Sequence, residues 1–172
     1  MRNTKVLFIT QAAVIAALYV ILTLIANAFG LANYAVQVRF SEALTILPYF
    51  TPAAIPGLFV GCILANILTG CMVLDTVFGS LATLVGAILT YLIGRYMKQY
   101  PVAKWLAPIP PIIANMIVVP QVLMRVYEFP GTLLYFTLTV GAGEVISCFV
   151  FGMILFFVLN PRKNAIFRTK MQ

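Results

Sequence analysis

Residues 6–29, VLFITQAAVIAALYVILTLIANAF, form an uninterrupted apolar run that decides the class of fold. In a helix this run is about 36 Å long, enough to cross the roughly 30 Å hydrocarbon core of a bilayer. It follows Arg2 and Lys5, and residues 26–28 imitate the small-residue cleavage site of a secretory signal. The apolar region of a signal is only about 7 to 15 residues long, so we expect a retained first membrane helix.

The composition extends this conclusion to the whole chain. Of its 172 residues, 63% are apolar and 9% are charged, whereas a soluble domain carries about 25% charged residues. At about 20 residues for each crossing, the chain holds roughly six spans. We therefore expect one integral membrane domain over residues 1–172, all α-helical, with no second aqueous domain.

Proline and loop residues divide the chain into spans. A loop is expected at residues 30–39. The apolar block at residues 40–69 contains Pro48, Pro52 and Pro56, so it should break near residues 49–52 into two short or tilted helices. The other spans are expected at residues 75–97, 105–127 and 132–159, with prolines making the entry to the fifth irregular.

Charge then predicts the orientation. With six spans and both termini in the cytoplasm, nine of the eleven cations lie on the inner side, which is the pattern of the positive-inside rule. Only Arg39 and Arg125 remain outside. The cations lie at helix ends rather than along a basic groove, which argues against nucleic-acid binding. The inner cations are Arg2, Lys5, Arg95, Lys98, Lys104, Arg162, Lys163, Arg168 and Lys170.

Several kinds of chemistry are disfavoured. The chain has no His and no phosphate-loop or dinucleotide-binding motif, so it lacks a catalytic triad and a nucleotide-hydrolysing domain of its own. Cys62, Cys71 and Cys148 lie in apolar runs and are expected to be small buried residues. The four acids show no close catalytic pair or metal cage, so we expect neither an enzyme nor a cofactor.

Ionisable and amide side chains at bilayer depth are candidates for function, because burying a charge there costs about 2.5 kcal/mol or more. Glu144 lies twelve residues into the last span, and Asn115 lies twelve residues before the end of the fifth. Both thus reach a depth of about 18 Å on antiparallel helices. Together they could bind the paired N–H donors of a guanine-like ring; the alternative is a hydrogen bond between helices.

Two acids lie closer to the predicted outer surface. Glu42 follows Arg39 by three residues, so the two could pair at the lip of a pocket or form an interfacial ion pair. Asp75 could contact a cationic ligand group or could be the N-cap of its helix. Arg125 and Glu128 have the same spacing as the first pair, and there we expect a solvated ion pair.

Weaker candidates complete the set. Asn66 could contact a ligand or bond to a neighbouring helix. Tyr34 belongs to a group of aromatic residues that could stack on a flat ring or form an interfacial belt. The other members of this group are Phe29, Tyr49, Tyr127, Phe129 and Tyr135.

Small residues mark two helix faces. The first span contains two overlapping A-x-x-x-A pairs, and Gly57 and Gly61 form a G-x-x-x-G pair. Such faces allow close helix packing, either within the chain or against a partner. The alanines are Ala12, Ala13, Ala16 and Ala17.

Residues 38–70, VRFSEALTILPYFTPAAIPGLFVGCILANILTG, and residues 74–87, LDTVFGSLATLVGA, resemble the queuosine precursor transporter (QueT) family. The similarity extends from the alanines of the first span to GAGEVISC at residues 141–148. Members of this family are substrate-binding S components of energy-coupling factor transporters. The R-x-S-E-A-L and D-x-x-F-G-S-L-A-T stretches are its specific features here.

The resemblance implies a six-helix bundle in the plasma membrane of a prokaryotic cell, with the substrate held near the outer side. It implies a partner scaffold subunit with two ATPases, contacted by the alanine face, and a 7-deazaguanine substrate such as the aminomethyl form. Glu144 with Asn115 would then take the ring edge, and Asp75 or Glu42 the ammonium. The alternative is a stand-alone proton-coupled transporter of a small nucleobase-like or vitamin-like solute.

Overall fold

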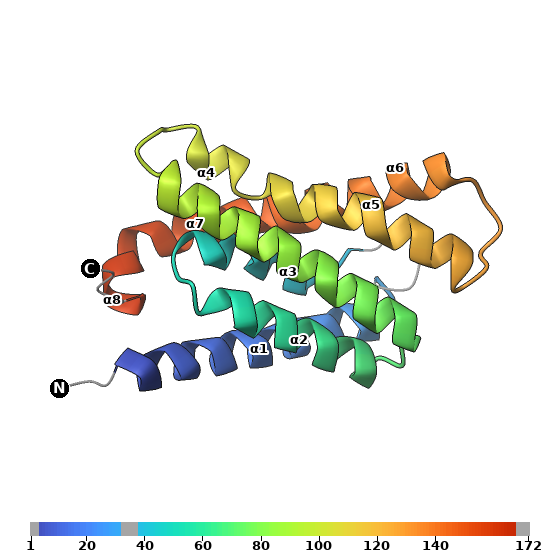
Figure 1. Cartoon of the computed structure of the whole chain (residues 1–172), viewed down its shortest axis with the longest axis horizontal. Helices are drawn as coiled ribbons and strands as arrows, with labels where there is room; N and C mark the ends of the chain where they lie inside the picture. The colour runs from blue at the N-terminus through green and yellow to red at the C-terminus, as the bar shows by residue number, and fades with distance from the viewer. Residues whose placement is uncertain (1–3, 32–37, 168–172) are drawn as a thin grey trace.

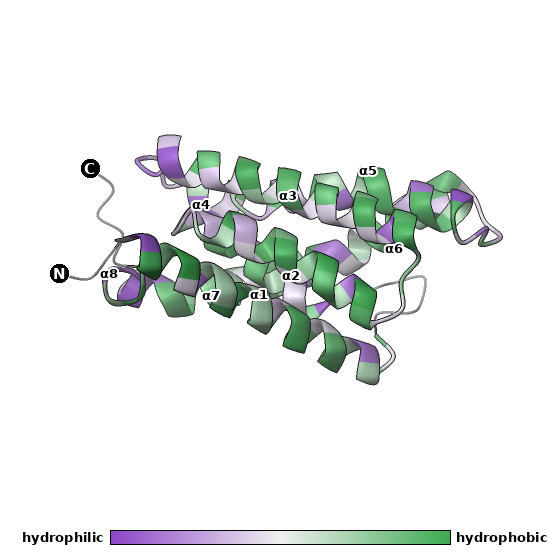
Figure 2. Cartoon of the chain, turned by 60° about the horizontal axis from the view of Figure 1, so that its bottom comes forward, coloured by the Kyte–Doolittle hydropathy of each residue, from purple (hydrophilic) through white to green (hydrophobic). Residues whose placement is uncertain are grey.

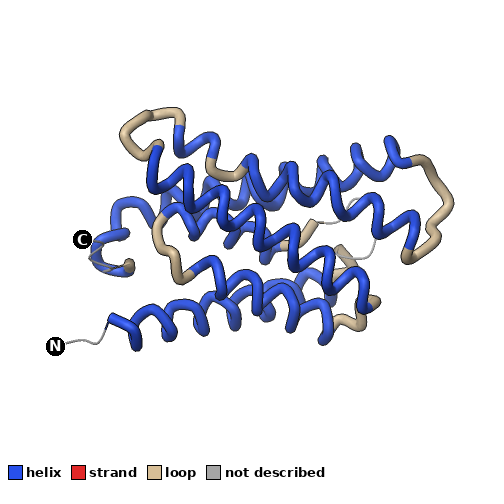
Figure 3. Tube along the Cα trace, viewed as in Figure 1, coloured by secondary structure: helices blue, strands red, loops and turns tan. Residues whose placement is uncertain are grey.

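The computed structural model describes residues 4–31 and 38–167, which form helices joined by short connections, with no strand in these two ranges (Figures 1 and 3). The helices are α1 (Thr4–Ala28), η1 (Phe40–Tyr49), α2 (Ala54–Leu68), α3 (Val73–Tyr96), α4 (Ala103–Leu106), α5 (Ile109–Arg125), α6 (Leu133–Glu144), η2 (Val145–Phe151), α7 (Gly152–Leu159), η3 (Asn160–Arg162) and α8 (Lys163–Ile166).

Four helical stretches are long and apolar enough to cross a membrane, namely Thr4–Ala28, Val73–Tyr96, Ala103–Arg125 and Leu133–Ile166. They match the predicted first, fourth, fifth and sixth spans. Most of the helical ribbon is coloured hydrophobic, and the most hydrophilic residues lie largely toward the helix ends (Figure 2). Many large apolar side chains are exposed on these helices. The chain is therefore an all-helical protein with several helices able to span a membrane, whereas the count of six spans stays a prediction.

The predicted break in the proline-containing block is confirmed, but its first half differs from a membrane span. η1 is a 3-10 helix of ten residues, about 20 Å long at 2 Å per residue. Its residues from Leu44 to Tyr49 are buried, as are Ser41 and Glu42. η1 packs against α1, α3, α7 and η2. It is therefore a central element of the bundle, enclosed by other helices.

Close packing of α1 on α2 uses the small residues that the sequence singles out. A Cβ atom added at Gly57 would lie 2.7 Å from the Ala12 carbonyl oxygen, and one at Gly61 would lie 3.1 Å from Ala16 Cα. Ala12 is half-buried and Ala16 buried by this contact, so the first alanine pair packs within the chain.

The second alanine pair faces outward. Ala13 and Ala17 are exposed and lie about 100° round α1 from Ala12 and Ala16. Of the two A-x-x-x-A pairs, this one remains accessible to a partner.

The start of α1 and the C-terminal helix α8 lie at the same end of the bundle (Figure 1). Gln11 Nε2 donates a hydrogen bond to the Ile166 carbonyl oxygen at 3.2 Å, which joins the two segments. The arrangement is compatible with both termini on one side of a membrane. Which side this is stays a prediction.

The last long helix changes its geometry in the middle. α6 ends at Glu144, and the next turns, Val145–Phe151, form the π-helix η2 before α7 resumes α-helical geometry. Such π segments are rare and often occur at functional sites. Here the π segment buries Ser147 and Cys148 one turn after Glu144.

Candidate functional site

Two carboxyl groups and a thiol meet in the interior of the bundle. One oxygen of Glu42, one oxygen of Glu144 and the sulfur of Cys148 all lie within 4.8 Å of one another. Glu42 is 2% exposed, Glu144 is 7% exposed and Cys148 is fully buried. The Cys148 thiol donates to Glu144 Oε2 at 3.1 Å. We refer to these three residues as the acid cluster.

The central 3-10 helix places Glu42 in this cluster. The hydroxyl group of Tyr19 on α1 donates to Glu42 Oε1 at 2.5 Å. One turn further along α1, Thr23 and Ser41 bond through their hydroxyl groups at 2.8 Å. Glu42 Oε2 is buried and has no hydrogen-bond partner. The cluster therefore presents a free acceptor, and a buried acceptor without a donor costs about 1–3 kcal/mol.

An amide and a guanidinium group complete the surroundings. Asn115 of α5 is 5% exposed, and its side chain lies close enough to interact with the Glu144 carboxyl group. Arg39 lies within electrostatic range of Glu42 and Glu144. Its backbone N–H donates to Ser147 Oγ at 3.1 Å, which ties the start of η1 to η2. The structure thus brings Asn115 and Glu144 together, as their matching depths predict.

The expectation that the acids form no close pair is wrong, because Glu42 and Glu144 are neighbours in the fold. The sequence predicted that Glu42 lies at the outer end of a membrane-spanning helix. In the structure it belongs to η1, which is enclosed by other helices. Two carboxyl groups and a thiol at this spacing could hold a metal ion or a ligand with N–H donors. If both carboxyl groups are ionised, the single positive charge of Arg39 offsets only part of their negative charge, so a cationic N–H donor would still be attracted to the cluster.

A second polar group lies where α2 turns into α3. The Tyr127 hydroxyl donates to Asp75 Oδ2 at 2.8 Å and accepts from the Met72 N–H at 3.2 Å. Burial, with the neighbouring Asp75 carboxyl, raises the pKa of Tyr127 above its ordinary value, so the phenol stays protonated and donates. Asn66 lies beside Asp75 across Gly79, since a Cβ atom there would be 3.6 Å from Asn66 Nδ2 and 3.7 Å from Asp75 Oδ1.

Some sequence expectations about these outer residues are corrected. Asp75 is not an N-cap, because Met72 occupies that position and Asp75 lies within the first turn of α3. The described residues Arg125 and Glu128 form no ion pair; the chain leaves the helix after Arg125, and Glu128 adopts a left-handed conformation with φ of 52°. Tyr34 lies outside the described residues.

Tyr49 does not belong to the site. It lies at the end of η1 away from Glu42 and packs edge-on against Phe156 at 5.3 Å. A stacking role beside the acid cluster is therefore excluded for this residue.

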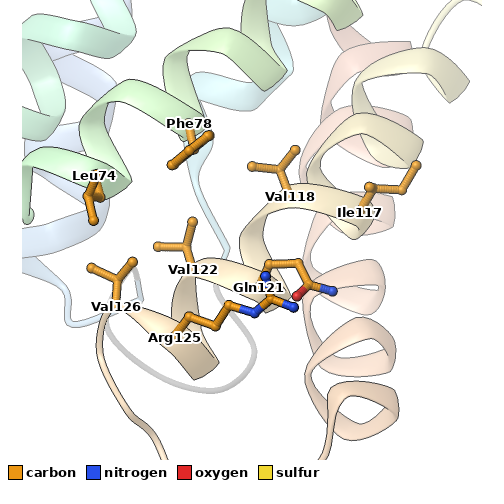
Figure 4. Close-up of a pocket in the computed structure, with 8 residues that line it drawn as sticks. All are labelled: Leu74, Phe78, Ile117, Val118, Gln121, Val122, Arg125 and Val126. Carbon is orange, nitrogen blue, oxygen red and sulfur yellow. The ribbon is translucent and has the colours of Figure 1, made fainter.

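A separate groove of about 430 Å³ lies between α3 and α5 (Figure 4). Its lining is mostly apolar, and its polar members, Gln121 and Arg125, lie beside one another at the rim. Leu74, Phe78 and Ile117 in its lining are exposed. Neither carboxyl group of the acid cluster lines it. The groove therefore belongs to the apolar outer surface rather than to the candidate site.

Sequence reasoning missed three members of the site: Tyr19, Ser147 and Cys148. Each lies in an apolar run and is indistinguishable there from ordinary packing residues. For two of them a partial signal exists, because Ser147 and Cys148 follow Glu144 by about one helical turn and so share its face. No comparable signal connects Tyr19 to Glu42, 23 residues away.

The model of one protein family, described as QueT transporter, matches residues 9–161 of the chain. The chain belongs to the QueT transporter family. This match includes η1, most of α1 and most of the long C-terminal helix, and thus every residue of the acid cluster. The family resemblance seen in the sequence is confirmed.

A relative of this QueT family chain is named "Queuosine precursor transporter QueT" and comes from Lactococcus lactis subsp. cremoris (strain MG1363). The two are 34% identical over 101 residues, or 58% of this chain, and the aligned part spans 59% of the relative. No solved structure matches the chain.

Proposed function

We propose that this chain is the substrate-binding component of an energy-coupling factor transporter in a prokaryotic plasma membrane. It binds a 7-deazaguanine precursor of queuosine at the outer end of the bundle, and a scaffold subunit with two ATPases drives uptake. The single observation that carries this proposal is the buried acid cluster with its unpartnered acceptor, Glu42 Oε2, in a chain of the QueT family.

The chemistry of the cluster suits a guanine-like ring. Such a ring presents adjacent N–H donors on one edge, and a carboxylate accepts two donors at once in short, charge-assisted hydrogen bonds. Glu144 supplies this carboxylate, with Oε2 already oriented by the Cys148 thiol. Asn115, beside it, supplies an amide that can donate to the ring carbonyl. Asp75 is less suitable, because its Oδ2 is already bonded to Tyr127.

The test of this function is binding of 7-deazaguanines to the purified chain by calorimetry, with mass spectrometry of any small molecule that co-purifies. Replacing Asn115 by Ala should raise the Kd about tenfold, since one hydrogen bond to the ligand is lost. Gln121→Ala is the matched control, because Gln121 is a polar residue of the same helix that faces the separate groove. An unchanged Kd in Asn115→Ala would remove this residue from the site.

The exposed alanines of α1 are proposed as the contact with the scaffold subunit. Replacing Ala13 and Ala17 by Trp should abolish co-purification of the scaffold and ATPases, because bulky side chains prevent close helix approach. Ligand binding by the isolated chain should persist, since neither alanine faces the acid cluster. Leu18→Trp, at an exposed position about 100° further round α1 from Ala17, is the control. Equal loss of the complex in this control would argue against a small-residue contact.

A second candidate function is a stand-alone transporter driven by protons. The proximity of Glu42 and Glu144 favours it, because two close carboxyl groups in a membrane can share and transfer a proton. Liposomes that contain only this chain would then accumulate the precursor under a pH gradient. Accumulation that requires the scaffold, the ATPases and ATP would instead support the first proposal.

A further inference from the structure

The two oxygens of Glu42 have different surroundings. Oε1 accepts a hydrogen bond from the Tyr19 hydroxyl at 2.5 Å, whereas Oε2 is buried and accepts none. Buried polar atoms in folded proteins nearly always have partners, and an exception calls for an explanation. Because Glu42 belongs to the acid cluster, a donor on a bound ligand is the explanation that we consider for its unpartnered oxygen.

Tyr19 is held so firmly that it fixes the orientation of the Glu42 carboxyl group. It is 1% exposed, and a Cβ atom at Gly61 of α2 would lie 2.8 Å from Tyr19 Cβ, so there is no space to move toward α2. The Thr23–Ser41 hydrogen bond holds α1 and η1 together one turn away. Oε1 already accepts from Tyr19, so Oε2 is the oxygen that still lacks a donor.

The charges of the cluster favour a positively charged donor. Two carboxyl groups, Glu42 and Glu144, lie within range of the Arg39 guanidinium group. If both are ionised, the ligand must supply positive charge to balance them, because an uncompensated buried charge is strongly unfavourable. An ammonium group supplies both the charge and the N–H donors. A nitrile supplies neither, and its nitrogen is itself an acceptor that would face Oε2.

We infer that Tyr19 determines the ligand preference of the site by orienting Glu42 to receive a cationic amino group, so that aminomethyl-deazaguanine binds in preference to cyano-deazaguanine. This inference rests on the proposed function. The two compounds share one ring and differ in a single substituent, aminomethyl or nitrile. Tyr19 is a positioning residue, since it acts through Glu42 and does not touch the ligand.

The test compares the Kd values of both compounds for the wild-type chain and for Tyr19→Phe. The wild-type chain should bind the aminomethyl compound at least about tenfold more tightly, as expected for a charge-assisted hydrogen bond. In Tyr19→Phe the Kd of the aminomethyl compound should rise about tenfold while that of the cyano compound stays within about twofold. The ratio of the two Kd values then falls toward one.

A control separates positioning from packing. Thr90→Val removes another buried hydroxyl group, which donates to the Ala107 carbonyl oxygen at 2.9 Å and bonds to no member of the acid cluster, and should leave the ratio unchanged. If Tyr19→Phe weakens both compounds equally, Tyr19 has only a packing role and the inference is overturned.

The Glu42→Gln variant provides an independent test of the preference between the two compounds. With the amide oxygen held by the Tyr19 hydroxyl, the amide nitrogen takes the place of Oε2 and can donate to a nitrile, so the preference should narrow or reverse. Equal Kd values for both compounds in the wild-type chain would overturn this inference alone. Failure of the wild-type chain to bind either compound would overturn the proposed function as well.

Discussion

Replacing Glu144 by Gln should weaken binding of the deazaguanine ligand by about a hundredfold or more. The carboxylate is proposed to accept two N–H donors of the ring, and hydrogen bonds to a charged group contribute about 1.5–3 kcal/mol each. The amide in its place carries no charge and offers one donor where an acceptor is needed. Calorimetric titration of the purified chain measures the change in Kd.

Glu128→Gln is the matched control for this prediction. It removes the same charge from an exposed position after α5, outside the acid cluster. Its Kd should remain within about twofold of the wild-type value. Full affinity in a correctly folded Glu144→Gln variant would contradict the assignment of Glu144, though not the membership of the family.

Replacing Gly57 by Ala should destabilise the whole bundle, although the change adds a single methyl group. The new Cβ atom would lie 2.7 Å from the Ala12 carbonyl oxygen and 3.0 Å from Ile15 Cβ. The backbone carbonyl cannot rotate away, so α1 and α2 must separate, and overpacking of this kind typically costs about 1–3 kcal/mol. Thermal unfolding in detergent should show the loss as a lower Tm.

Gly79→Ala tests whether the close contact is the cause. It adds the same methyl group to α3, but the nearest atom would be Asn66 Nδ2 at an ordinary contact distance of 3.6 Å. Because Ala is otherwise a better helix former than Gly, this variant should keep or slightly raise the Tm. A similar loss of stability in both variants would show that the α1–α2 contact is not decisive.

Patterns within single segments correctly predicted much of the architecture. Apolar length indicates the long helices, and the three prolines indicate the break between η1 and α2. The equal depths of Asn115 and Glu144 bring them together because both lie on long helices with a regular rise of 1.5 Å per residue. In each case the relevant property depends on nearby residues or on simple helical geometry.

The acid cluster could not be predicted in the same way. Its members come from η1 and the last long helix, about a hundred residues apart, and a 3-10 helix enclosed by others has the same apolar composition as a short span. Tyr19 reads as one more large residue of an apolar helix. Its role depends on the position of Glu42, which only the packing of η1 establishes.

The alanine-rich part of α1 shows a different limit of prediction from sequence. The sequence contains two equivalent pairs, and both packing within the chain and docking to a partner need small residues. The structure separates them, since Gly57 and Gly61 pack against Ala12 and Ala16 while Ala13 and Ala17 remain exposed. The spacing alone carries no information on which pair packs inside.

The π segment after Glu144 makes the site depend on the number of residues as well as on their identity. A π-turn contains more residues per turn than an α-turn, so η2 resembles the product of a one-residue insertion into an ancestral α-helix. Deleting one residue there would rotate Cys148 and the rest of the last helix away from Glu144. Among related sequences, substitutions between residues 144 and 148 should therefore be more common than insertions or deletions.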